Sequence, residues 1–314
     1  MRHESHDRDK FHVVTMISNP VRYESRYELY KVFAAKMASA GVNLTTVELQ
    51  LGDRPFAITD RDCARHIQLR GWDELWHKEN CLNIAIQSLP SDWETVAWID
   101  ADVEFIRPDW VEETINQLQV YQVVQMFETA IDLGPSGKTI ATHKSFMSQY
   151  LENKSMHPET SYQEWHPGFA WAARREAIDG MGQLYERAIL GAGDRHMALA
   201  FVGKAECSFV HDMQSEYAQD ILRFQDRCHH TIRKDVGVVP GTIVHNWHGK
   251  KRDRRYFDRW QILINNDYKP HRDIKKDSFG VFNFVDDHSP RFIRLRDEIR
   301  HYFRQRNEDS VDLE

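Results

Sequence analysis

Two aspartates, Asp100 and Asp102, directly follow an apolar run at residues 96–99 that is typical of a buried strand. In extended backbone, residues two apart project to the same side, so both carboxylates can converge at the end of this strand. Neighbouring carboxylates repel each other unless a cation or a proton relieves them, and a hard divalent ion would do so while keeping positions for phosphate. An acidic turn with both side chains in solvent fits the same pattern, and both interpretations stay open here.

His245 and His248 form a second group with the spacing of metal ligands. They follow a predicted strand at residues 242–244, and two imidazoles three residues apart can reach one ion, although a half-buried histidine pair is the alternative. A basic run follows them, which favours the metal site because ligands beside fixed cations suit a departing diphosphate. The run contains Lys250, Lys251, Arg252, Arg254 and Arg255. A solvated helix face would account for some of these side chains.

Asp194 ends a run of small residues, Gly-Ala-Gly-Asp at residues 191–194, ahead of a predicted helix at 195–201. Small residues let a substrate approach the backbone closely, and a carboxylate there can accept the proton of a hydroxyl group. Aspartate is also a favoured helix N-cap, and the two roles are compatible. Asp194 is therefore the candidate general base.

Net charge, cysteine spacing and hydropathy each argue against certain classes of protein. The chain has 314 residues and a net charge of −7, so it has no overall attraction to nucleic acid or to an anionic membrane. Its four cysteines are far apart in sequence, which argues against a zinc ribbon or a disulfide scaffold and favours a reducing compartment. No stretch resembles a signal peptide or approaches the roughly 18 apolar residues of a membrane span. We therefore expect a cytoplasmic protein.

The elements that must position these residues read as an α/β fold. A strand at residues 11–17, a helix at 24–40 and a strand at 42–51 form a β-α-β unit, which predicts a parallel sheet. Further helices are predicted at 72–88, 108–118, 175–185, 195–201, 250–263 and 290–305, and further strands at 120–127 and 168–173. Residues 134–153 and 265–288 read as irregular loops, and residues 307–314 as a mobile acidic tail.

Five segments, in one order, resemble motifs of the GT-A nucleotide-sugar glycosyltransferases, most closely the β-1,4-galactosyltransferase-like branch and its bacterial and phage relatives. They are residues 20–26, 99–102, 166–170, 191–194 and 245–248. They resemble the family's Pro-Phe-Arg-x-Arg segment, its Asp-x-Asp signature, its Gly-Gly strand, its Trp-Gly-Gly-Glu-Asp element and its Met-x-x-His ligands. The chain departs from the family at Asp194, which is followed by Arg195 instead of a second acid, and at His245, which replaces methionine.

The resemblance covers residues 11–260 and implies a GT-A fold, a Rossmann-like and mostly parallel central sheet flanked by helices, here with a helical C-terminal extension. Residues 1–10 would then be a disordered lead and residues 11–264 the glycosyltransferase domain. Residues 265–314 would form a loop and an arginine-rich helix packed on or near that domain.

The resemblance also implies roles for individual residues. Those expected to bind the donor nucleotide or its phosphates are Asn19, Pro20, Arg22, Arg26, Lys78, Asn83, Asp100, Lys250, Lys251 and Arg252. Those expected to line the sugar and acceptor pocket are His166, Gly168, Phe169, Trp171 and Gly193. Those expected at the metal are Asp102 and His248, with Asp100 and His245 as further ligands. The implied ion is Mn²⁺, with Mg²⁺ as the alternative.

The activity implied is metal-dependent transfer of a sugar, with inversion, from a nucleotide-diphosphate sugar to an acceptor hydroxyl. The donor would be a UDP-sugar and the acceptor a glycan or another hydroxyl compound. Three alternatives remain at this point: a retaining transferase, a phage-type enzyme that glycosylates hydroxymethylated DNA bases, and a non-catalytic nucleotide-sugar-binding protein. In the second, the arginine-rich helix at residues 290–305 would lie along DNA phosphates.

Overall fold

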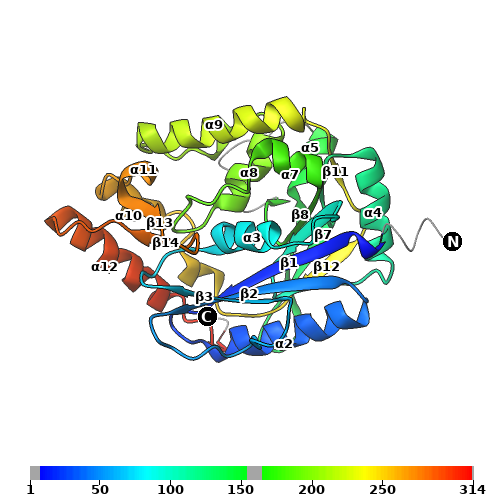
Figure 1. Ribbon diagram of the computed structural model, residues 1–314, viewed down its shortest axis with the longest axis horizontal. Coiled ribbons are helices and arrows are strands. Elements are labelled where there is room, and N and C mark those ends of the chain that lie inside the picture. Colours follow the sequence, from blue (N-terminus) through cyan, green and yellow to red (C-terminus); the bar gives the residue numbers. More distant parts are fainter. Residues whose placement is uncertain (1–7, 154–164, 313–314) are drawn as a thin grey trace.

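The structure is a computed structural model that describes residues 8–153 and 165–312 (Figure 1). Its central sheet consists of β1 (Phe11–Ser18), β2 (Asn43–Leu51), β3 (His66–Gly71), β4 (Thr95–Ile99), β6 (Val123–Gln125), β10 (Ala170–Arg174) and β11 (Val236–Val238). The strand order is β11-β6-β10-β4-β1-β2-β3. All neighbours are parallel except β10, which runs antiparallel to both β4 and β6. The expected α/β class with a mostly parallel sheet is confirmed.

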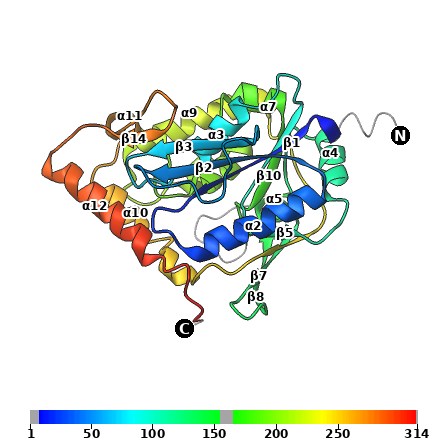
Figure 2. The same cartoon turned by 60° about the horizontal axis from the view of Figure 1, so that its bottom comes forward.

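Helices cover both faces of this sheet (Figures 1 and 2). One face packs on α2 (Glu24–Ser39) and α4 (Trp110–Val120), the other on α3 (Lys78–Gln87), α7 (Arg175–Met181), α8 (Gly193–Phe201) and α9 (Ser215–Thr231). Strand β4 shows why both faces are covered. Its Val96 and Trp98 pack with α3 and α8, whereas Ala97 and Ile99 pack with α2 and α4, so the apolar run of this strand is buried on both sides.

A second sheet brings the histidines to the end of β4. It consists of β5 (Val103–Phe105), β12 (Thr242–His245), β7 (Thr129–Leu133), β8 (Thr139–Ser145) and β9 (Trp165–His166), in the order β5-β12-β7-β8-β9. Just past β12, the amide of Asn246 donates to the carbonyl of Asp102 at 2.8 Å. The expectation of an irregular excursion at residues 134–153 is wrong, because β8 pairs with β7 and is followed by helix α5 (Phe146–Asn153).

The C-terminal residues form a helical extension, as expected. Its elements are α10 (Arg259–Asn265), α11 (Pro270–Asp273), β13 (Ile274–Lys276), β14 (Phe282–Phe284) and α12 (Pro290–Gln305). The hairpin of β13 and β14 and the helix α11 correct the expectation of a loop at 265–288. The helix expected at 250–263 forms only from Arg259 onward, as α10, and the expectation is wrong for residues 250–258. Only a 3-10 turn, Lys251–Arg254, forms before Arg255 adopts a φ of 44°, a left-handed conformation that interrupts a helix.

Both ends of the described chain are held in place. Of the predicted disordered lead, residues 1–7 lie outside the described residues, but Arg8 pairs with Glu112 at 2.8 Å and Lys10 pairs with Glu94. Of the predicted mobile tail, Glu308 is only 1% exposed, so that expectation is wrong at this position. Across residues 8–153 and 165–312, none of the helices combines the length and the apolar character needed to cross a membrane.

Candidate active site

A cleft lies where β1 and β4 end, beside the start of β10 and the end of β12. Parallel strands present their carboxyl ends at one edge of a sheet, which is why loops far apart in sequence meet here. The cleft is also lined by α3, by the turn before α8, and by Phe303, Arg306 and Glu308 from the C-terminal extension. It therefore draws on almost the full length of the chain.

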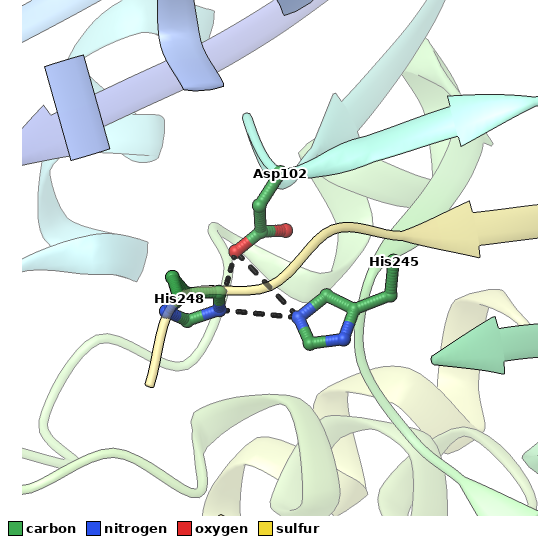
Figure 3. Close-up of side chains that lie close together, drawn as sticks. All are labelled: Asp102, His245 and His248. Carbon is green, nitrogen blue, oxygen red and sulfur yellow. Dashed lines mark hydrogen bonds and ion pairs between the residues drawn. The ribbon is translucent and has the colours of Figure 1, made fainter. Parts of the chain in front are cut away.

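Asp102, His245 and His248 converge in this cleft (Figure 3). Asp102 Oδ2 lies 3.0 Å from His248 Nε2 and 3.9 Å from His245 Nε2, and the two Nε2 atoms are 3.1 Å apart. The aspartate stands in the turn after β4, His245 ends β12, and His248 follows in the next turn. Three potential ligand atoms from two different sheets thus face one point.

The donor atoms of these three residues fit a divalent cation. Metal–ligand distances of about 2.0–2.2 Å place adjacent ligand atoms roughly 3 Å apart, close to two of the three separations seen here. In addition, Asp102 Oδ1 is buried and has no hydrogen-bond partner among the described residues. A buried carboxylate oxygen without a partner is costly unless a cation or a ligand satisfies it. Two histidines and one carboxylate, with positions left open, suit Mn²⁺ and related divalent ions.

Asp100 does not join this group. Its carboxylate pairs with Lys78 Nζ at 2.5 Å, on the first turn of α3. Burial and the neighbouring Asp102 raise the pKa of Asp100 to about 6, against the opposing effect of Lys78. Burial would also raise the pKa of Asp102, but its hydrogen bond to His248 and the charges of both histidines hold it well below its ordinary value. Asp100 and Asp102 therefore have pKa values shifted in opposite directions, and only Asp102 groups with the two histidines.

Asp132, on β7, contacts the Nδ1 atom of His245, the ring nitrogen that does not face His248. Its Oδ1 lies 2.8 Å from His245 Nδ1, and its Oδ2 contacts His143 Nε2 at 2.6 Å and the ammonium of Lys251. Despite burial, these partners keep the pKa of Asp132 well below its ordinary value. A carboxylate on Nδ1 favours the tautomer in which Nε2 of His245 carries no proton, and that nitrogen faces Asp102 and His248.

Two further carboxylates, those of Asp194 and Glu79, also line the cleft, and each is packed on a glycine. A Cβ added to Gly168 would lie 2.2 Å from Asp194 Oδ2, and one added to Gly193 would lie 2.6 Å from the carboxylate carbon of Glu79. Burial raises the pKa of Glu79 to about 8, although Lys78 opposes the shift. The N-cap of α8 is Ala192, with a φ of 74°, so the N-cap role weighed for Asp194 is wrong.

His166 and Phe169 form a wall beside these carboxylates. Their rings stack with centroids 3.7 Å apart, and Phe169 also contacts the ring of His245 at 4.7 Å. Phe169 has a φ of 74°, which residues with a Cβ rarely adopt and which is common at functional sites. These two stacked rings, the aromatic wall of the cleft, therefore reach His245 through Phe169.

Cations line the remaining side. Arg254 is 7% exposed, its Nη2 lies 3.0 Å from His248 Nε2, and its Nε has no hydrogen-bond partner within the described part of the chain. Arg306 is 4% exposed and lies over the ring of Trp76, with Arg26 and Arg259 nearby in the lining. A buried guanidinium with an unused donor is suited to an anionic ligand.

The structure brings most of the predicted site residues to the cleft. Those in its lining are Asn19, Pro20, Arg26, Lys78, Asp100, Asp102, His166, Phe169, Asp194, His245 and His248, with Gly168 and Gly193 just behind two of its carboxylates. Those outside its lining are Arg22, Asn83, Trp171, Lys250, Lys251 and Arg252.

Four of the six predicted site residues outside the lining have identifiable partners or surroundings elsewhere. Asn83 is on α3, but it faces the loop after α7, where it exchanges hydrogen bonds of 3.0 and 2.8 Å with the backbone of Leu184. Trp171 is a core residue whose Nε1 donates to the carbonyl of Pro167 at 2.7 Å. Lys251 pairs with Asp132, and the side chain of Arg252 is 67% exposed.

Sequence reasoning missed several residues of the cleft. These are Trp76, Glu79, Arg259, Arg306 and Glu308, and Arg254 was noted only as part of the basic run. For Glu79 a signal existed, since it adjoins Lys78 at the start of a helix that the resemblance already implicates. For Arg306 and Glu308 no local pattern distinguishes them from other charged residues near the end of the chain.

No protein-family model and no curated protein matches the chain. Among solved structures, it is similar to Drosophila β1,4-galactosyltransferase 7 in a complex with manganese, UDP-Gal and xylobiose, at 14% identity, 60% of this chain, 59% of that chain and a TM-score of 0.32. It is also similar to a putative nucleotide-diphospho-sugar transferase of Desulfovibrio desulfuricans G20, at 13% identity, 98% of this chain, 100% of that chain and a TM-score of 0.31.

A third similar structure is the 4-diphosphocytidyl-2C-methyl-D-erythritol synthase of Anaerococcus prevotii, at 13% identity, 75% of this chain, 89% of that chain and a TM-score of 0.33. The match to the Drosophila enzyme spans less than two thirds of that protein's own chain. At identities and TM-scores this low, the function of this chain must be inferred from the residues of its own cleft.

Proposed function

We propose that this protein is a metal-dependent glycosyltransferase that moves a sugar from a nucleotide-diphosphate sugar to an acceptor hydroxyl. The observation that carries the proposal is the convergence of Asp102, His245 and His248 in a cleft that also holds buried arginines and the carboxylates of Glu79 and Asp194. One oxygen of Asp102 has no hydrogen-bond partner among the described residues. The resemblance of the five sequence motifs indicates a UDP-sugar as donor and a glycan or other hydroxyl compound as acceptor.

Each part of the cleft has a role in this proposal. Asp102, His245 and His248 would hold the ion, preferably Mn²⁺, which when bound would neutralise the donor diphosphate and stabilise the leaving group. Arg254 is placed beside His248 to contact phosphate oxygens, and Lys78 keeps Asp100 oriented at the edge of the cleft. Asp194 would take the proton of the acceptor hydroxyl as that oxygen attacks the anomeric carbon in line, with inversion. The aromatic wall of His166 and Phe169 would exclude water and orient the sugar.

A donor screen tests this proposal. Nucleotide sugars are offered to the full chain with and without Mn²⁺, and thermal shift and nucleoside diphosphate release are measured. We expect Mn²⁺-dependent release with at least one UDP-sugar. Asp102→Ala and His248→Ala should each lower it by at least about 100-fold, because each removes a ligand of the ion. Asp62→Ala, at an exposed position before β3, is the control and should behave as wild type.

Full metal-dependent activity in both Asp102→Ala and His248→Ala would refute the proposal. Stereochemistry is a separate question, because a retaining transferase could use the same ion. The anomeric configuration of the product, read by NMR, separates inversion from retention. A nucleotide-sugar-binding protein without catalysis would show the thermal shift but no nucleoside diphosphate release.

The DNA alternative has less support in the structure. Helix α12 is rich in arginine, but Arg291 pairs with Asp273 at 2.9 Å, and Arg304 and Arg300 both pair with Glu74. Arginines already matched to acids contribute little to a phosphate-binding surface. A glycan or another hydroxyl compound is therefore the favoured acceptor class.

A further inference from the structure

The residues after α12 turn back into the cleft and place a buried carboxylate beside His248. Glu308 accepts hydrogen bonds from Arg26 Nη2 at 2.8 Å and from Arg306 Nε at 2.5 Å, and it also contacts Arg26 Nε. Its Oε2 lies 3.7 Å from His248 Nδ1, on the side of the ring opposite the metal-facing Nε2. Glu308 is 1% exposed, so these four groups form a closed cluster.

The backbone around Glu308 is fixed by separate contacts. The amide of Asn307 donates to the hydroxyl of Tyr23 at 3.0 Å, and Trp247 Nε1 donates to the carbonyl of Ser310 at 2.6 Å. Asp309 accepts from the first backbone amides of α2, which have no partner within the helix. The segment also packs on Gly249, where a Cβ would lie 2.8 Å from the Cα of Glu308. Residues 306–310 are therefore built into the wall of the cleft.

The two histidines have corresponding surroundings. Each presents Nε2 to the common point and has a buried carboxylate on its Nδ1 side: Asp132 at 2.8 Å for His245, and Glu308 at 3.7 Å, slightly beyond hydrogen-bond distance, for His248. A histidine that binds a metal through one ring nitrogen is commonly oriented by a carboxylate at the other, and loss of that carboxylate typically weakens metal binding by about 10–100-fold. Asp132 comes from β7 and Glu308 from the end of the chain, so this second carboxylate is not apparent from local sequence.

We infer that residues 306–310 are a fixed part of the active site and that Glu308 is a positioning residue, which orients His248 and Arg26. This inference rests on the proposed function, because it takes His248 to be a metal ligand. The opposing idea is that Glu308 occupies a phosphate position and leaves when the donor binds. If Glu308 left, Arg306, which is 4% exposed, would lose its carboxylate partner. A buried charge without its partner is strongly destabilising.

Charge also favours a fixed Glu308. Two arginines share its single carboxylate, so the cluster keeps a net positive charge that can still attract an anionic donor. The carboxylate of Glu308 would thus hold both guanidinium groups in place without neutralising their combined positive charge.

The test is Mn²⁺ binding to the full chain, measured by calorimetry and by electron paramagnetic resonance without a donor. We expect Glu308→Gln to weaken Mn²⁺ binding about 10–100-fold. The control is Asp297→Asn, at an exposed position of α12 outside residues 306–310, and its Mn²⁺ affinity should stay within about twofold of wild type. If Glu308→Gln does not fold, Glu308→Asp keeps the charge and withdraws the carboxylate by one methylene, and we expect at least about threefold weaker binding.

The outcomes separate this inference from the proposed function. If wild type binds Mn²⁺ and His248→Ala does not, but Glu308→Gln binds as wild type does, only the positioning role is overturned. Tighter donor binding by Glu308→Gln, with unchanged Mn²⁺ affinity, would show that Glu308 is a displaceable occupant. Absence of Mn²⁺ binding in wild type would overturn the proposed function, and this inference with it.

Discussion

Glu79 and Asp194 place two carboxylates on one side of the cleft, close to a single ammonium group. Burial would lower the pKa of Lys78, but the charges of Asp100, Asp194 and Glu79 together raise it, so Lys78 stays protonated. Glu79, with a pKa raised to about 8, carries its proton near pH 7. A neutral carboxyl group can donate a hydrogen bond to a substrate oxygen, which an ionised one cannot do. Near neutral pH we therefore expect Glu79 to act as a hydrogen-bond donor and Asp194 as the base.

Glu79 should leave a signature in the pH dependence of stability. The unfolded chain releases this proton near pH 4.5, whereas the folded chain keeps it until about pH 8. The folded state thus binds more protons in that window, and the free energy of unfolding falls as pH rises through it, by up to about 1.4 kcal/mol per pH unit. Urea denaturation between pH 5 and about 8 should show this slope in wild type and a shallower one in Glu79→Gln. The exposed Glu28→Gln should retain the wild-type slope, and parallel curves for wild type and Glu79→Gln would contradict the assignment.

A substitution at Gly168 tests the role of Asp194 as the base. Gly168→Ala would put a methyl group 2.2 Å from Asp194 Oδ2 and must displace that carboxylate. A displacement of about 1 Å can cost about 100-fold in rate, so we expect kcat for transfer to fall by roughly that factor. Gly71→Ala on β3, where a Cβ would meet only ordinary contacts, should change kcat less than about twofold. Equal rates in the two variants would exclude Asp194 as the base.

At the scale of elements, the C-terminal extension belongs to the same core as the central sheet. Phe292, Leu295 and Ile299 of α12 are fully buried in the larger hydrophobic cluster, with α3 and α8. Because α12 leads directly to Arg306 and Glu308, its packing sets the position of the wall that faces His248.

Substitutions on two adjacent residues of α12 test this integration. Phe292→Ala removes a side chain with no exposed surface and should lower the free energy of unfolding by about 3–5 kcal/mol. Ile293→Ala, at a position that is 45% exposed, should cost less than about 1 kcal/mol. Chemical denaturation followed by fluorescence measures both. A small effect of Phe292→Ala would mean that the extension folds independently of the sheet.

Several elements were predictable because their signal is local. Strands β1 and β4 are apolar runs that end at polar turns, and both lie close to their predicted positions. Helix α9 was missed although Tyr217, Ile221, Phe224 and Cys228 lie on one face at helical spacing, because its remaining residues are strongly polar. The basic residues after Gly249 have good helix propensity, yet contacts with the C-terminal segment and the left-handed Arg255 keep most of them out of a helix.

At the scale of the whole molecule, the cleft is assembled from segments that no local pattern connects. The pairing of Asp102 with His248 was predictable, because each lies in a motif at the end of a predicted strand. The carboxylates beside the two histidines were not predictable, because Asp132 and Glu308 become relevant only when two sheets and the C-terminal extension meet. Long-range packing therefore decides which of the many charged residues belong to the site.

Metal binding should stabilise this assembly as a unit, because the ligands come from both sheets. A ligand that binds only the folded state at about 100 times its dissociation constant adds about 2.7 kcal/mol to the free energy of unfolding. We expect Mn²⁺ to raise Tm by several degrees, excess EDTA to reverse the shift, and His245→Ala to abolish it. An equal Mn²⁺ shift in His245→Ala would place the ion elsewhere.

The most direct measurement is anomalous diffraction from crystals of the full chain grown with Mn²⁺ and a UDP-sugar. The proposal predicts one strong manganese peak within about 2.3 Å of Asp102 Oδ2, His245 Nε2 and His248 Nε2, with the diphosphate of the donor on its open side. A manganese peak away from these three residues, or none at a saturating concentration, would contradict it.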